Sequence, residues 1–246
     1  MNGLGIVAAL TAETRALGRA TTSGAAPASL ADGTLLVVSG MGPAAAARGA
    51  RALADAGVRA LISWGMAGGL DPTLAAGTLL LPHEVASPEG ALFLTAGDWR
   101  QRLRSALLAS QPVCCGKLLT CRAAIASSAD KAVAFRQTAA VAVDMESLAI
   151  AEVAASRRLP FLVVRAIVDT AADEVPRALV AAAATGADGV SLGRLIGALA
   201  RTPPDLLPIL RLARRFRAAS RALAAAVASG ALAPPLVSVP SGNGPP

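Results

Sequence analysis

Short apolar runs alternate along the chain with stretches whose apolar residues recur at helical spacing. The apolar runs predict strands at residues 4–10, 35–39, 60–64, 78–81, 117–121, 141–143 and 161–167. The intervening stretches predict helices at residues 43–56, 98–108, 128–135 and 146–157, with Pro43 in the opening turn of the first and Ser128 capping the third. Residues 161–167 form a continuous apolar run, which is typical of a strand covered on both faces. This alternation predicts an α/β fold, a three-layer α/β/α sandwich with a mixed central sheet.

Length and composition narrow the class of protein. The 246 residues fit one large domain, and a hydrophobic fraction of 54%, much of it alanine, suffices for a buried core. The charge-free stretch 222–246 contains two consecutive prolines that would break a spanning helix, and no basic region precedes the first apolar run. Three closely spaced cysteines are too few for a disulfide framework, and the single histidine, His83, is expected to serve the surface or the structure rather than a metal site or a Ser-His-Asp triad. We therefore expect a cytoplasmic protein without a signal peptide or a membrane span.

The formal net charge of +7 comes almost entirely from arginine. Nucleic acid is the least favoured partner, because the chain has no tyrosine and only 2% aromatic residues with which to stack on bases. An anionic substrate and a membrane surface stay open as reasons for the charge.

Three carboxylates follow predicted strands: Glu13, Glu146 and Asp169. Ligands of α/β sheets bind beyond the carboxyl ends of the strands, where partial burial raises the pKa of a carboxyl group. Taken singly, each residue also suits a helix start or a turn. The three together, in this order, favour an active site.

The same residues lie in four motifs that resemble those of the nucleoside phosphorylase/nucleosidase superfamily. The motifs are GIVAALTAE at 5–13, GMAGG at 65–69, VDME at 143–146 and VRAIVD at 164–169, within a resemblance that spans about residues 4–173. The branch that they resemble most is methylthioadenosine/S-adenosylhomocysteine nucleosidase. The resemblance implies cleavage of a purine N-ribosyl bond and a homodimer.

The resemblance also implies a role for each motif residue. Asp169 matches the acid that donates a proton to purine N7, an aid that is typically worth 10²–10⁴-fold in rate. Glu146 matches the carboxylate that binds the ribose hydroxyls, and Met145 the residue that packs on the sugar. Glu13 matches the carboxylate that orients and deprotonates water in the nucleosidases.

The glycine-rich segment, expected as a substrate-binding loop, contributes Gly65, Met66 and Gly68 to the predicted site. Many nucleosidases have serine where Met66 and Val168 stand, so two hydroxyl groups near the nucleophile and the acid are missing. Water and phosphate both remain candidate nucleophiles, although the retained glutamate at position 13 favours hydrolysis. No metal or organic cofactor is implied, and inorganic phosphate would be a co-substrate of a phosphorolytic reaction.

Two arginines, Arg15 and Arg48, are candidates to hold that phosphate. We expect His83, Phe135 and the Cys114–Cys115 pair to serve packing or the surface rather than chemistry, whereas Trp64 suits either core packing or the wall of the site.

Residues 201–221 contain six arginines and one aspartate in a helical pattern with one apolar face. Such a helix either lies on an anionic membrane or packs on the domain with its arginines in solvent. The segment and the stretch GMAGGLDP at 65–72 are similar to those of the hopanoid-associated phosphorylases. That resemblance implies adenine release from adenosylhopane and peripheral contact with the inner membrane.

The predicted organisation is a catalytic domain at residues 1–200, an arginine-rich helical extension at 201–228 and a flexible tail at 229–246. Two alternatives to the hopanoid function stay open. One is an ordinary methylthioadenosine/S-adenosylhomocysteine nucleosidase, and the other is a non-catalytic nucleoside-binding protein.

Overall fold

The computed structural model describes residues 3–18, 24–175 and 206–234. The strands are β1 (Leu4–Ala8), β2 (Gly24–Ser29), β3 (Leu35–Val38), β4 (Ala60–Gly69), β5 (Leu79–Leu80), β6 (Glu84–Ala86), β7 (Leu92–Leu94), β8 (Val113–Cys114), β9 (Leu118–Thr120), β10 (Ala142–Asp144) and β11 (Phe161–Asp169). The helices are the 3-10 helix η1 (Thr11–Leu17) and α1 (Pro43–Asp55), α2 (Gly97–Leu107), α3 (Ser128–Thr138), α4 (Ser147–Ser156) and α7 (Leu206–Ala228).

One mixed sheet forms the centre of the molecule and divides at its longest strand, β4. Strands β3, β1, β4 and β11 run parallel, with β4 between β1 and β11. The far end of β4 also pairs antiparallel with β10, and through β10 the sheet continues to β9, β6 and β7. The other branch continues from β11 to β5 and β8. The predicted α/β fold with a mixed sheet is confirmed.

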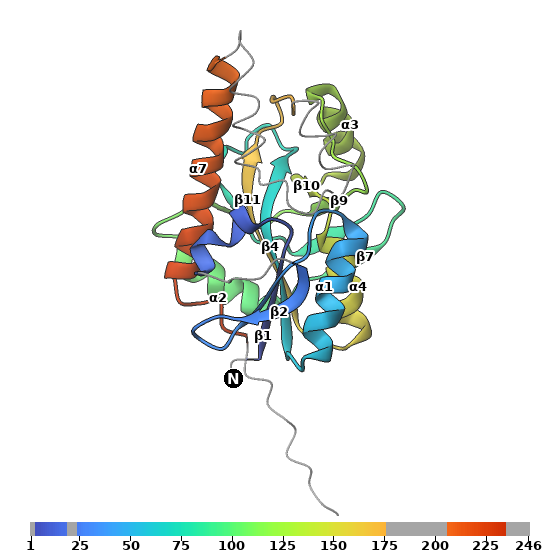
Figure 1. Ribbon diagram of the computed structural model, residues 1–246. Helices are drawn as coiled ribbons and strands as arrows, with labels where there is room; N and C mark the ends of the chain where they lie inside the picture. Colours follow the sequence, from blue (N-terminus) through green and yellow to red (C-terminus); the bar gives the residue numbers. More distant parts are fainter. Residues whose placement is uncertain (1–2, 19–23, 176–205, 235–246) are drawn as a thin grey trace, which may run out of the picture.

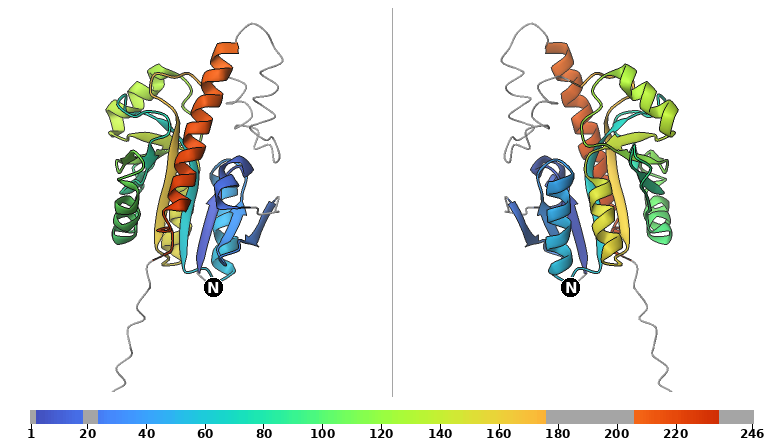
Figure 2. Two further views of the ribbon diagram at one scale, coloured as in Figure 1. Left: turned by 90° about the vertical axis from the view of Figure 1, so that its left-hand side faces the viewer. Right: turned by 90° about the vertical axis from the view of Figure 1, so that its right-hand side faces the viewer.

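Helices cover both faces of this sheet, as Figures 1 and 2 show. Helices α1 and α4 lie together on one face, and α2 and α7 on the other. The side chains of each central strand alternate between two cores. In β1, for example, Leu4 and Ile6 face the core under α2 and α7, whereas Val7 faces the core under α1 and α4.

The structure corrects three details of the sequence prediction. The glycine-rich segment 65–69 is not a loop but the second half of β4. The run at 161–167 is buried throughout but not wholly apolar, because it contains the buried Arg165. Helix α3 is capped by Ser127, whose hydroxyl accepts a hydrogen bond from the Asp130 amide, and Ser128 is its first helical residue. The sequence patterns also missed η1, β2, β6, β7 and β8, which are short or poor in branched apolar residues.

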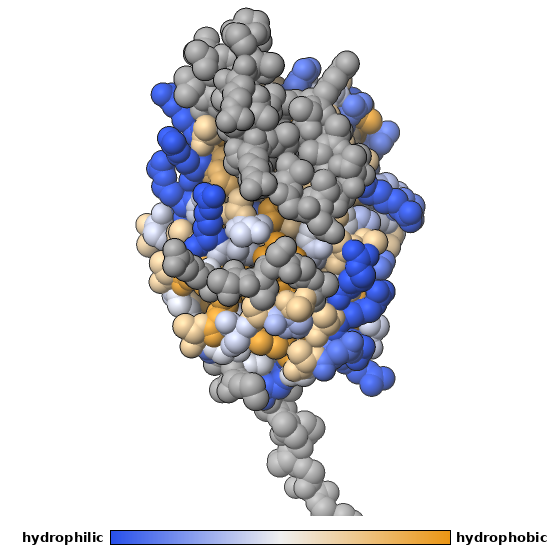
Figure 3. Space-filling view, in the orientation of Figure 1, coloured by the Kyte–Doolittle hydropathy of each residue, from blue (hydrophilic) through white to orange (hydrophobic). Residues whose placement is uncertain are grey.

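Helix α7 packs against β11 and η1, and its small apolar side chains enter the core. Ala219, Ala222 and Leu223 are fully buried, whereas Arg214 and Arg217 point into solvent. Figure 3 shows hydrophilic residues along the outer edge of this helix. Residues 211–228 therefore pack on the domain, which is one of the two arrangements that the sequence left open. Within the described ranges, no helix has both the length and the apolar character needed to cross a membrane.

Candidate active site

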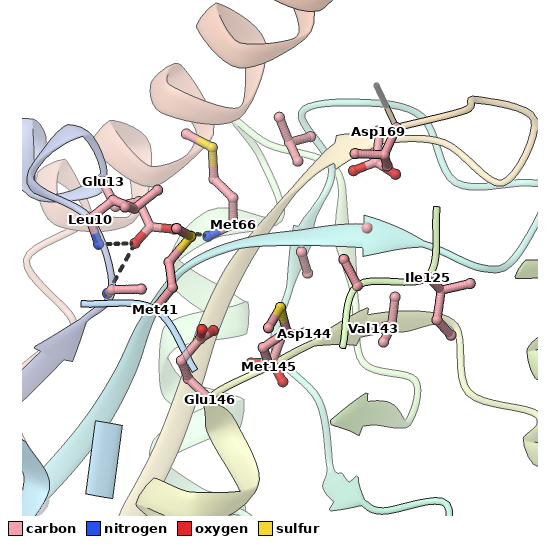
Figure 4. A pocket seen from close by; sticks show the side chains of 16 residues that line it. Leu10, Glu13, Met41, Met66, Ile125, Val143, Asp144, Met145, Glu146 and Asp169 are labelled. Atoms are coloured by element: carbon pink, nitrogen blue, oxygen red, sulfur yellow. Dashed lines mark hydrogen bonds between the residues drawn. The ribbon is translucent and has the colours of Figure 1, made fainter. Parts of the chain in front are cut away.

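A cavity of about 200 Å³ opens beyond the carboxyl ends of β1, β4, β10 and β11. Figure 4 shows Glu13 and Asp169 on opposite sides of it, with Glu146 and Met145 between them. Met66 and Gly68 also line the cavity, whereas Gly65 is not among its described lining residues. The fold thus gathers all but one of the predicted site residues, although Glu13 and Asp169 lie at opposite ends of the matched sequence.

Glu13 stands in η1, directly after β1, with its carboxylate held by backbone amides. Its Oε2 accepts hydrogen bonds from the amides of Ala9 (3.2 Å) and Leu10 (3.0 Å), and its Oε1 accepts one from the Met66 amide (2.9 Å). Burial raises the pKa of Glu13, against the opposing effects of the Arg165 cation and these amides. The side chain therefore supports the turn after β1 and also presents a basic oxygen beside the cavity.

Glu146 lies between β10 and α4, at the N-terminus of α4. It accepts a hydrogen bond of 2.9 Å from the amide of Gly42, the residue that precedes α1. Burial raises the pKa of Glu146 to about 7, with Arg165 opposing the shift and the nearby Asp144 adding to it. The carboxylate is thus poised to change charge near neutral pH.

Arg165 is a central residue of the site to which sequence reasoning gave no role. It is 1% exposed, and its Nη2 lies 2.7 Å from Asp144 Oδ2 and 3.6 Å from Glu146 Oε2. The same nitrogen donates hydrogen bonds to the hydroxyls of Ser63 (2.9 Å) and Ser147 (3.3 Å). A single charged residue within the otherwise apolar run 161–167 was the signal that could have identified it, since a buried charge is retained only with partners.

Two glycines of β4 make room for the charged side chains. Gly65 pairs with Arg165 in the sheet, and a Cβ there would lie 2.5 Å from both Arg165 Nη1 and Glu13 Oε1. Its φ of 155° also disfavours other residues. A Cβ on Gly68 would lie 3.2 Å from Asp169 Oδ2. Gly65 thus leaves room for the side chains of Arg165 and Glu13, although it does not itself line the cavity.

Asp169 is the last residue of β11, not the residue after the strand, and it is paired with a lysine that the sequence analysis missed. The Nζ of Lys131, on α3, donates to Asp169 Oδ2 and also to the carbonyls of Thr170 and Asp173, both at 2.9 Å. Burial raises the pKa of Asp169, and the Lys131 cation opposes this effect. A raised pKa favours the protonated carboxyl group that a general acid requires.

The family model of the Phosphorylase superfamily matches residues 29–191, which is most of the chain. The chain belongs to this superfamily. The expectation of a nucleoside-cleaving enzyme is therefore confirmed at the level of the superfamily.

Solved structures agree with this membership in their fold. The 5'-methylthioadenosine/S-adenosylhomocysteine nucleosidase of Neisseria meningitidis superposes with a TM-score of 0.69 at 19% identity, covering 93% of this chain and 98% of its own. The corresponding enzyme of Streptococcus pneumoniae gives 0.68 at 20% identity, with 94% and 98% covered. The futalosine hydrolase of Helicobacter pylori gives 0.66 at 16% identity, with 92% and 97% covered. No curated protein sequence matches the chain.

In this member of the superfamily, the two departures from the nucleosidase motifs lie in the cavity wall. Both Met66 and Val168 line it and make it more apolar. The two arginines considered for phosphate do not. Arg15 borders a second hollow of about 270 Å³ between η1 and α7, and Arg48 is exposed on α1.

Three other residues singled out in the sequence make packing contacts or hydrogen bonds to the backbone. Trp64 is fully buried and donates a hydrogen bond of 2.9 Å from its Nε1 to the Glu13 carbonyl, so it supports the turn that carries Glu13. The Nδ1 of His83 lies 2.6 Å from the Cys115 carbonyl, outside the cavity. Phe135 packs on a small core beneath α3.

Proposed function

We propose that the protein hydrolyses the N-ribosyl bond of a purine nucleoside. The observation that carries this proposal is the convergence of three carboxylates, Glu13, Glu146 and Asp169, on one cavity. Their raised pKa values suit residues that hold or move protons during a reaction.

Asp169 is assigned as the general acid. A purine anion is a poor leaving group, and protonation at N7 lets the base depart as a neutral molecule. Gly68 leaves the carboxyl group room to approach the base, because this residue has no side chain between Asp169 and the cavity.

Glu146 is assigned to the ribose. Its carboxylate can accept hydrogen bonds from two hydroxyl groups, while Met145 supplies an apolar surface for the sugar. Positive charge develops at the anomeric carbon as the bond breaks, and the negative groups at this end of the cavity stabilise it.

Glu13 is assigned as the base that orients and deprotonates water. Hydrolysis is favoured over phosphorolysis because a buried carboxylate would repel phosphate. Among the described lining residues of the cavity there is no arginine, and Arg165 behind it is engaged by Asp144. Three of the similar structures are of enzymes named as nucleosidases or a hydrolase, which supports the same choice.

For the substrate we propose adenosylhopane, with release of adenine. The cavity wall is largely apolar, and three of the four methionines of the chain line it: Met41, Met66 and Met145. Flexible methionine side chains accommodate bulky apolar groups. The arginines on the outer face of α7 suit contact with an anionic membrane, where such a lipid would be met.

The alternative substrates are methylthioadenosine and S-adenosylhomocysteine, as the names of the similar structures suggest. The test incubates the full chain with adenosylhopane in detergent, and separately with each soluble nucleoside, with and without phosphate. Mass spectrometry then identifies the free base and the sugar product. Adenine release without phosphate supports hydrolysis, whereas release that requires phosphate refutes it. Cleavage of the soluble nucleosides alone refutes the lipid substrate, and binding without any base release supports a non-catalytic protein.

The membrane contact is tested with vesicles containing anionic lipid. An Arg214→Gln/Arg217→Gln variant should bind them about tenfold or more weakly than the wild type, since each arginine near such a surface contributes about 1 kcal/mol. The matched control is Arg48→Gln/Arg51→Gln, which removes two exposed arginines from α1 on the opposite face. Equal loss in both variants would indicate a general charge effect and no docking face on α7.

A further inference from the structure

We propose that Lys131 is a positioning residue, which holds Asp169 Oδ2 so that the proton for the leaving base is carried by Oδ1. The inference rests on the proposed function, because it concerns the acid of that reaction. It assigns a role to the one lysine of the chain that is completely buried.

The ammonium group of Lys131 is saturated by its surroundings. It has three N–H donors, and three acceptors face them: Asp169 Oδ2 and the carbonyls of Thr170 and Asp173. The side chain is 0% exposed. A buried ammonium is stable only with such partners, so its charge and the carboxyl group of Asp169 form one unit.

This contact makes the two carboxyl oxygens of Asp169 unequal. Oδ2 receives a hydrogen bond from a cation and so is the less favourable place for a proton. Oδ1 has no hydrogen-bond partner among the described residues, and Asp169 lines the cavity. The proton of the acid therefore resides on Oδ1, where a bound base can receive it.

In the hydrolytic reaction, Asp169 gives its proton to the purine base as the glycosidic bond breaks. The Oδ1–H bond breaks, an N7–H bond forms, and the electron pair of the glycosidic bond moves onto the purine. The Asp169 carboxylate left behind is stabilised by the Lys131 ammonium, while water supplies the new bond at the anomeric carbon and gives up its proton to Glu13.

The turn that follows Asp169 is fixed from a second direction. Asp173 accepts hydrogen bonds from the amide (2.9 Å) and the hydroxyl (2.7 Å) of Thr170, and it forms an ion pair of 2.6 Å with Arg215 of α7. The charged groups that face Asp169 are thus Lys131 from α3, Asp173 from the turn and Arg215 from α7. Of these, only Lys131 contacts the carboxyl group itself.

The choice of lysine is itself informative in this sequence. Only two of its 23 basic Lys and Arg residues are lysines, Lys117 and Lys131. A compact ammonium can direct its donors to three acceptors around one point, whereas a planar guanidinium cannot. Lys117 offers a matched control, because it also contacts a carboxylate, Glu84 (3.2 Å), and a carbonyl, that of Thr138 (3.2 Å), but lies outside the cavity.

The test compares kcat and its pH dependence in the wild type, Lys131→Met and Lys117→Met with a nucleoside that the wild type cleaves. We expect Lys131→Met to lower kcat by about 10²-fold, with KM nearly unchanged, because the acid loses its orientation. Without the cation, Asp169 also holds its proton to higher pH, so the alkaline limb of the profile moves upward. Lys117→Met should match the wild type. A purely structural role would lower kcat at every pH without moving the limb.

A second comparison asks whether Lys131 acts through Asp169. In an Asp169→Asn background, Lys131→Met should cause no further loss of kcat, since the acid is already gone. Additive losses would overturn the proposal, as would a Lys131→Met enzyme with wild-type kcat and pH profile. Lys131→Gln keeps two donors without the charge and serves if the methionine variant does not fold by circular dichroism. If neither folds, Lys131 is a structural residue and the proposal fails. Absence of base release by the wild type would instead refute the proposed function.

Discussion

The two ends of the cavity differ in how many carboxylates share one buried cation. At the end formed by β1 and α4, Arg165 faces Glu13, Asp144 and Glu146. There burial would lower the pKa of Arg165, but the three carboxylates hold it above its ordinary value. Three negative charges against one positive charge leave this end negative when all are ionised.

At the other end, one cation meets one carboxylate. Lys131 pairs with Asp169, and the remaining donors of the ammonium are used by carbonyl groups. The difference teaches that the same elements, a carboxyl group and a buried cation, serve two tasks. Excess negative charge suits a sugar that becomes cationic, whereas a balanced pair suits a group that must give up one proton.

The largest expected effect comes from removing the proton at the balanced end. Asp169→Asn keeps the size of the side chain but cannot act as an acid, so kcat for an adenine nucleoside should fall by about 10²–10⁴-fold. KM should change little, because the ribose contacts remain. Steady-state kinetics with detection of free adenine measure both constants. Wild-type kcat in this variant would remove Asp169 from the mechanism and, with it, the contrast between the two ends.

A second large effect is expected from removing the cation at the negative end. Arg165→Met leaves Asp144 and Glu146 buried without a counter-charge, so the free energy of unfolding should fall by about 3–5 kcal/mol. Denaturation in urea measures the change. Arg157→Met is the matched control, because its ion pair with Asp55 is solvent-exposed, at 47% for Arg157 and 62% for Asp55, and is expected to contribute at most about 1 kcal/mol. Similar losses in the two variants would show that the buried ion pairs of Arg165 contribute no more to stability than an exposed ion pair does.

Alanine substitutions at two glycines of β4 are smaller changes, and their effects should differ between the two ends of the cavity. In Gly65→Ala the new methyl group would meet Arg165 and Glu13 at 2.5 Å, so both stability and kcat should fall. In Gly68→Ala it would meet Asp169 at 3.2 Å, a contact that a small shift relieves. We therefore expect Gly68→Ala to fold normally and to lose about tenfold in kcat, since a displaced acid acts less well. Thermal unfolding and steady-state kinetics show which of the two variants loses more stability and activity. A larger loss in Gly68→Ala than in Gly65→Ala would contradict the expected difference between the two ends of the cavity.

The strands and helices that position the site could be predicted where their patterns are long. The apolar runs of β1, β4 and β11 and the helical period of α1 and α4 are visible in the sequence, and strand ends located all three carboxylates. The short strands β6, β7 and β8 could not be predicted from pattern, because two or three residues carry no period. The extension of β4 through its glycines depends on pairing with β11 and β10, which no local pattern encodes.

The two cations were missed for different reasons. Arg165 lies in a run whose average character is apolar, so its one charge went unnoticed, although a charge in such a run calls for buried partners. Lys131 lies 38 residues from Asp169 on a helix with a polar sequence, and only the fold brings them together. Sequence patterns thus located the carboxylates that line the cavity at strand ends. The residues that set their charge come from other elements.

The smallest expected effect is the change of protein stability with pH that the titration of Glu146 causes at the negative end of the cavity. Because burial raises the pKa of Glu146 to about 7, the folded protein binds more protons than the unfolded chain between the ordinary glutamate pKa and pH 7. The free energy of unfolding should therefore decrease as pH rises through this window. In Glu146→Gln the decrease should be smaller, though not absent, since the pKa values of Glu13 and Asp169 are raised as well. Glu152→Gln, at an exposed position on α4, should keep the wild-type dependence.

The same titration should appear in substrate binding, but in the opposite sense. Ribose hydroxyls donate to the ionised carboxylate of Glu146, so KM should rise by about tenfold per pH unit below pH 7 as the group takes up a proton. As pH falls, protonation of Asp169 supplies the acid whereas protonation of Glu13 removes the base, so kcat reports on those two groups and KM on Glu146. Measuring kcat and KM separately between pH 5 and 8 tests this split. A KM that is independent of pH would mean that Glu146 does not bind the sugar as an anion, and the two ends of the cavity would then not differ in charge as described.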